Sequence, residues 1–155
     1  MKSILITTCI TQESDNAEAM FGEKDIVESA FDFKFQNLID DCGITADDMQ
    51  KVHEQEHEDF SCKSYLAEDD ACSFGLIFFK EVLPNQVIIL DLDYLTEVLT
   101  FETEVPHVTL TYLISQYLPV AAYLHGESLE DTEDYFYVTT ENLETGTKYL
   151  ILKVK

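Results

Sequence analysis

Apolar and polar positions recur along the chain in patterns that predict strands and helices. Residues 3–10 are rich in β-branched side chains, which is typical of a strand, whereas the polar residues 12–22 predict a loop or a short helix. Residues 23–41 predict a helix, because apolar side chains fall on one face at three- and four-residue spacings: Val27, Phe31, Phe35, Leu38 and Cys42. Gly43 follows where a helix end favours a left-handed residue.

A second helix is predicted over residues 46–59. Thr45 resembles its N-cap, since Asp48 follows three positions later as in a capping box and acidic residues suit a first turn. Its apolar seam is thin and consists of Met49, Val52 and Phe60. A helix packed through this seam would expose a rod of carboxylates.

The remainder of the chain predicts mostly antiparallel strands. A turn at Pro84 and Asn85 is expected to join strands at residues 73–81 and 86–93 as a hairpin. Residues 107–124 contain no Asp, Glu or Lys and predict a buried helix. We therefore expect one α+β domain over residues 1–155, with a largely antiparallel sheet of about five or six strands and two or three packed helices. The later candidate strands are residues 73–81, 86–93, 97–104, 135–140 and 148–154.

Charge changes this picture more than any other property of the chain. There are 31 Asp and Glu against nine lysines and no arginine, which gives a formal net charge of −22. Arginine is the preferred residue for bidentate phosphate contacts, and nucleic-acid binders need basic patches. We therefore expect no direct binding to nucleic acid or to an anionic membrane. With ten Phe and eight Tyr the chain is too aromatic for a disordered acidic tail.

Repulsion between like charges costs stability, and solubility does not require so many of them. The charge is therefore interpreted as an interface for a basic protein partner, the alternative being that it is only solvated. The acidic residues are densest in a first cluster within residues 40–70 and a second within residues 127–134. Tyr135 adjoins the second acidic cluster and could contact cations of the partner. The predicted partner-binding residues are Asp47, Asp48, Glu54, Glu56, Glu58, Asp59, Glu68, Asp69, Asp70, Glu127, Glu130, Asp131, Glu133, Asp134 and Tyr135.

One motif could support catalysis. Residues 53–57 read His-Glu-Gln-Glu-His and match the H-E-x-x-H pattern, so over these five residues the chain resembles the zincin metalloproteases. That resemblance implies a helix on which His53 and His57 bind zinc and Glu54 acts as general base. The flanking Glu56 and Glu58 depart from the family pattern, in which this helix is buried.

The leading hypothesis is a stoichiometric inhibitor without enzymatic activity or cofactor. It would be either an immunity protein that neutralises a basic nuclease toxin or a nucleic-acid mimic that blocks a nucleic-acid-binding enzyme. A zinc-dependent hydrolase and an acidic secretion chaperone are the alternatives. The four cysteines fit no paired zinc pattern and no convincing signal peptide is present, so we expect a soluble cytoplasmic protein with reduced thiols.

Overall fold

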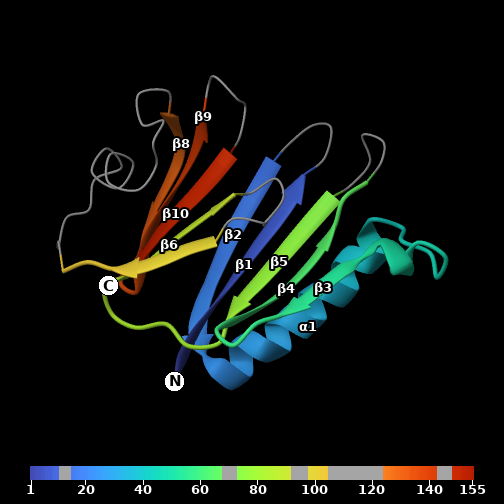
Figure 1. Cartoon of the computed structure of the whole chain (residues 1–155), viewed down its shortest axis with the longest axis horizontal. Coiled ribbons are helices and arrows are strands. Elements are labelled where there is room, and N and C mark those ends of the chain that lie inside the picture. The colour runs from blue at the N-terminus through green and yellow to red at the C-terminus, as the bar shows by residue number, and fades with distance from the viewer. Residues whose placement is uncertain (11–14, 68–72, 92–97, 105–123, 143–147) are drawn as a thin grey trace. The chain divides into compact units, whose positions relative to one another are not determined.

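The structure is a computed structural model that describes residues 1–10, 15–67, 73–91, 98–104, 124–142 and 148–155. Contacts divide the chain into two compact units, Met1–Val82 and Leu83–Lys155. The described residues form one α-helix and two five-stranded antiparallel sheets, one sheet in each unit (Figure 1). The α+β class is thus confirmed, whereas one sheet with two or three helices is wrong. The single-domain assignment stays a prediction.

The first unit contains a β-hairpin, a helix and a three-stranded meander. The strand order in its sheet is β2-β1-β5-β4-β3, and every neighbouring pair is antiparallel. Helix α1 carries the chain from one edge strand, β2, towards the other, β3 (Figure 1). The elements are β1 (Lys2–Ile10), β2 (Asp15–Glu23), α1 (Lys24–Asp41), a 3-10 turn η1 (Met49–Lys51), β3 (His53–Glu56), β4 (Phe60–Tyr65) and β5 (Ser73–Phe79).

The predicted helix 23–41 is confirmed as α1, which packs on one face of this sheet. Its buried side chains are Val27, Phe31, Phe35 and Ile39, while Leu38 and Cys42 are only partly buried against the same cluster. The sheet contributes Leu5, Phe74, Leu76 and Phe78, which lie on one face because strand side chains alternate. The helix ends as predicted, since Gly43 has φ +64° and its N–H donates to the Asp40 carbonyl.

The predicted helix 46–59 is wrong. After a turn in which the Thr45 hydroxyl donates to the Asp48 carboxylate, the chain forms only the short η1 and then extends as β3. A seam of three apolar side chains buries too little surface to hold a helix. Pairing with β4 instead satisfies the backbone and sets Glu54 opposite Lys63 across the two strands.

The second unit consists of a second five-stranded sheet with the order β7-β6-β10-β9-β8. The two sheets therefore share one strand order, with each strand of the second sheet numbered five higher than its counterpart in the first. In each sheet the first strand of a hairpin pairs with the last strand of a three-stranded meander. The strands are β6 (Gln86–Asp91), β7 (Val98–Glu102), β8 (Leu124–Asp131), β9 (Tyr135–Asn142) and β10 (Lys148–Val154).

Most of the predicted strands are present, but one predicted pairing is wrong. β5 pairs on both sides with β1 and β4, so no hydrogen-bonding edge remains for β6, which joins the second sheet. Asn85 has φ 65°, and its N–H donates to the Val154 carbonyl of that sheet. The segment 12–22, predicted as a loop or short helix, contains β2 instead. The C-terminal hairpin of β9 and β10 is confirmed, and the predicted helix 107–124 falls almost wholly outside the described residues.

Candidate acidic binding surface and groove

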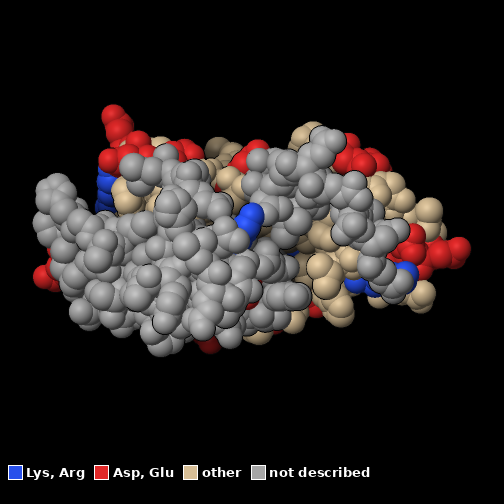
Figure 2. Space-filling model, turned by 90° about the horizontal axis from the view of Figure 1, so that it is seen from above, with Lys and Arg blue, Asp and Glu red and all other residues tan. Residues whose placement is uncertain are grey.

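Exposed acidic residues lie in the first half of α1 and at its C-terminal end. The helix buries its apolar face, so the remaining positions are turned to solvent. None of the exposed carboxylates of α1 forms an ion pair with a residue in the described ranges. They belong to Asp25, Glu28, Asp32, Asp40 and Asp41. Figure 2 shows acidic side chains gathered in several groups on the face in view, with lysines at fewer places.

Six lysines in the described part of the chain pair with carboxylates other than these five. Most of the pairs are solvent-exposed, so each contributes little to stability. These ion pairs occupy the lysines concerned, so those lysines do not neutralise the carboxylates of α1. The pairs are Lys2–Glu23, Lys34–Glu18, Lys51–Asp48, Lys63–Glu54, Lys80–Glu56 and Lys155–Asp131.

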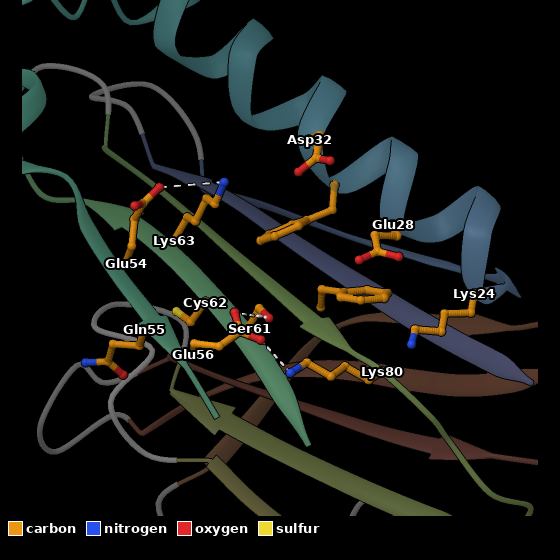
Figure 3. Close-up of a pocket in the computed structure, with 12 residues that line it drawn as sticks. Lys24, Glu28, Asp32, Glu54, Gln55, Glu56, Ser61, Cys62, Lys63 and Lys80 are labelled. Atoms are coloured by element: carbon orange, nitrogen blue, oxygen red, sulfur yellow. Dashed lines mark hydrogen bonds and ion pairs between the residues drawn. The ribbon is translucent and has the colours of Figure 1, made fainter. Parts of the chain in front are cut away.

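A groove of about 530 Å³ lies between α1 and the strands β3 and β4 (Figure 3). It exists because α1 packs on β1, β2 and β5, and a helix about 10 Å wide covers only two or three strands spaced about 4.8 Å apart. The same face of β4 and β3 therefore stays open beside the helix. Glu28 and Asp32 line the groove from α1, and Glu54 and Glu56 line it from β3.

Two lysines in the groove hold the carboxylates of β3. The Lys63 Nζ lies 3.6 Å from Glu54 Oε1, and it also lies 4.3 Å from the ring centroid of Phe35 and 5.1 Å from that of Phe31. Lys80 Nζ pairs with the Glu56 carboxylate and donates to the His57 carbonyl at 2.8 Å. Hydrogen bonds from Lys80 and then Ser61 lower the pKa of Glu56, which keeps this carboxylate ionised.

The predicted first acidic cluster is only partly brought together. Glu54 and Glu56 line the groove, whereas Glu58 and Asp59 are exposed in the turn between β3 and β4. Asp47 is exposed ahead of η1, and Asp48 pairs with Lys51 at 3.6 Å. Glu68, Asp69 and Asp70 lie outside the described residues.

The predicted second acidic cluster lies at the turn between β8 and β9 in the other unit. Glu130, Asp131, Glu133 and Asp134 are exposed, and Lys155 pairs with Asp131. Tyr135 is buried, and its hydroxyl donates a hydrogen bond to Glu130 Oε1 at 3.2 Å. This hydrogen bond helps to hold the Glu130 carboxylate in place. Burial and the nearby Glu130 raise the pKa of Tyr135 to about 12. Glu127 belongs to β8, at the register shift between Gly126 and Ser128.

Sequence reasoning missed the acidic face of α1 as a candidate site. Asp25, Glu28 and Asp32 follow one another at three and four residues, which puts them on one side of a helix. This spacing was visible once the apolar face of the same helix had been recognised. Acidic density by itself favours residues 46–59, where no α-helix forms.

The H-E-x-x-H motif lies on a strand and not on a helix. His53 begins β3 and His57 follows its end, so their Cα atoms are about 13 Å apart at 3.3 Å per residue. The His57 ring packs against Phe60 in a tilted arrangement with centroids 4.4 Å apart. The shared helical face that the zincin resemblance implies is therefore absent. Among the described residues no group of three or more His, Cys, Asp or Glu side chains could hold a metal ion.

Among the cysteines that the structure describes, Cys42 departs from the expectation of reduced thiols. Cys42 is disulfide-bonded, whereas Cys9 and Cys62 carry thiols. Burial raises the pKa of the Cys62 thiol to about 11, and burial followed by the charge of Asp41 raises that of Cys9. Both shifts favour the protonated thiol, which is a poor nucleophile.

Fold and surface together define an α+β protein with two antiparallel sheets and a strongly acidic helix. Within the described ranges, no helix has the length and apolar character needed to cross a membrane. Comparison with protein-family models, curated proteins and solved structures finds no match for this chain.

Proposed function

We propose that the protein is a stoichiometric inhibitor that binds a basic protein through its acidic surface and excludes that protein's substrate. The observation that carries the proposal is the row of carboxylates on α1 without an ion-pair partner among the described residues. A basic partner would supply the missing cations, and the long-range field would speed its association. The two forms of this function are an immunity protein for a nuclease toxin and a nucleic-acid mimic.

The position of the charges on α1 supports binding over mere solubility. A helix carries partial negative charge at its C-terminal end, where cations are favourable and anions unfavourable. The last turn of α1 contains no basic residue, and it carries Asp40 and Asp41. Glu28 and Asp32 are like charges one turn apart, which is also unfavourable by a few tenths of a kcal/mol. These carboxylates weaken the helix that carries them, so a gain outside the folded chain is the simplest reason for their presence.

Spacing on α1 also supports an anionic ladder that a nucleic-acid-binding surface would accept. At 1.5 Å per residue, Asp25 and Glu28 lie about 4.5 Å apart along the helix axis, and Glu28 and Asp32 about 6 Å. Phosphates of one DNA strand rise about 3.4 Å each. The helix thus presents charges at a somewhat wider repeat than a single nucleic-acid strand.

The test is a pull-down with the immobilised protein, performed at low salt and repeated at high salt, followed by purification of the captured proteins. The proposal expects a basic protein that is retained at low salt, released at high salt, and inhibited in its own nuclease or nucleic-acid-binding assay at a one-to-one ratio. Recovery of no basic or nucleic-acid-binding protein under either condition would refute it. Toxin-like nuclease activity in the captured protein would identify an immunity protein, and a housekeeping or defence enzyme would identify a mimic.

A further inference from the structure

The groove beside α1 already contains one cation in a defined setting. Lys63 reaches from β4 over the rings of Phe31 and Phe35 and pairs with Glu54 across the strands. Its side chain is only 22% exposed. A cation over an aromatic face beside a carboxylate is held by both interactions, and partial desolvation strengthens them. The groove is therefore built from residues that stabilise an ammonium or guanidinium group.

Charges in the groove do not balance. Its lining contains four carboxylates and three lysines, which gives a net charge of −1: Glu28, Asp32, Glu54 and Glu56 against Lys24, Lys63 and Lys80. Lys63 and Lys80 pair with the two carboxylates of β3. Glu28 and Asp32, on the helix wall, form no ion pair with a described residue. One further monovalent cation would bring the lining to neutrality.

From this arrangement we infer that the groove between α1 and the strands β3 and β4 receives an arginine side chain of the basic partner. This inference rests on the proposed function and names the contact through which it acts. Glu28 and Asp32 are separated by one helical turn, so the two edges of a planar guanidinium can each face one carboxylate. Lysine presents a single compact, strongly hydrated ammonium and would engage one carboxylate at a time.

The experiment uses hexaarginine as the probe, with hexalysine and the neutral hexacitrulline as comparison peptides. Wild-type protein is compared with the groove variant Glu28→Gln/Asp32→Asn and with the matched control Asp40→Asn/Asp41→Asn. Both variants remove two charges from the same helix, but Asp40 and Asp41 do not line the groove. Binding is measured by titration calorimetry at low salt, and NMR spectra follow the Phe31 ring and the Lys63 Nζ signals.

We expect the groove variant to weaken hexaarginine binding about tenfold and the control variant to weaken it less than threefold. Hexaarginine should shift the Phe31 and Lys63 signals in the wild type. Equal weakening by both variants, equal affinity for hexalysine, or undiminished binding of hexacitrulline would overturn the inference. Those outcomes leave the pull-down result of the proposed function untouched. Failure of the pull-down with intact groove binding would refute the function and the partner's arginine with it, and would leave only the groove's preference for arginine.

Discussion

The unfavourable placement of acids on α1 can be measured with two single substitutions at opposite ends of the helix. Asp25 lies in the first turn and Asp40 in the last, and both side chains are exposed and form no ion pair with a described residue. Asp25→Asn and Asp40→Asn remove the same charge from the same helix. Both substitutions relieve the overall repulsion of a chain with net charge −22, and their interactions with the helix dipole differ in sign.

Each charge near a helix end contributes about 0.3–1 kcal/mol at low ionic strength. Asp25→Asn loses a favourable contribution of that size, and Asp40→Asn removes an unfavourable one. The free energy of unfolding of Asp40→Asn should therefore exceed that of Asp25→Asn by about 0.6–2 kcal/mol. With a urea m-value of about 2 kcal/mol/M, the midpoints should differ by about 0.3–1 M.

Urea unfolding followed by far-UV circular dichroism provides the measurement, first in dilute buffer and then in 1 M salt. At 1 M salt the Debye length falls to about 3 Å, so the difference between the variants should largely disappear. Equal midpoints in dilute buffer, or a lower midpoint for Asp40→Asn, would refute the reasoning. The acidic end of α1 would then carry no penalty, and the support it gives to the binding proposal would be lost.

Three further predictions concern the core and the titrating groups. Phe31→Ala should reduce the free energy of unfolding by about 3–5 kcal/mol in urea titration, because the ring is 5% exposed and stacks on Phe78 at 5.8 Å; a loss below about 1 kcal/mol would contradict this packing. Cys62 has a pKa of about 11, so iodoacetamide at pH 8 should alkylate it roughly a hundredfold more slowly in the folded than in the unfolded chain, as followed by mass spectrometry. Tyr135 has a pKa raised to about 12, so its contribution to stability is complete below about pH 10 and is lost as the pH rises towards 12. Absorbance at 295 nm should show one fewer late-titrating phenol in Tyr135→Phe than in the wild type; titration of every wild-type tyrosine near pH 10 would disprove the shift.

Local sequence patterns were sufficient to predict the secondary structure where a helix or strand buries one face. Val27, Phe31 and Phe35 recur at helical spacing, and α1 forms where they predict it. The strands β1, β9 and β10 were predicted within one or two residues because their apolar runs are short and bounded by polar segments. Gly43 ends the helix in the left-handed conformation that its sequence position suggested.

Local patterns failed where long-range pairing decided the outcome. Thr45 and Asp48 form their hydrogen bond, yet β4 draws residues 53–56 into the sheet as β3. The apolar runs of β5 and β6 are adjacent in sequence and predicted a hairpin, but β5 uses both of its edges for β1 and β4. Which strands share an edge depends on partners far apart in the chain, and the pattern of a single segment does not carry that information.

For the candidate site too, some features follow from the sequence and others only from the tertiary structure. Composition alone established an arginine-free chain with a net charge of −22, and the proposal of a basic partner starts from that charge. The groove required the tertiary structure, because it arises where α1 covers three strands and leaves β4 and β3 open. Glu28 and Glu54 are 26 residues apart in the sequence and line the same groove only because the sheet places β3 beside the helix. The sequence by itself determined how much charge the protein carries, and the fold decided which charges face one another.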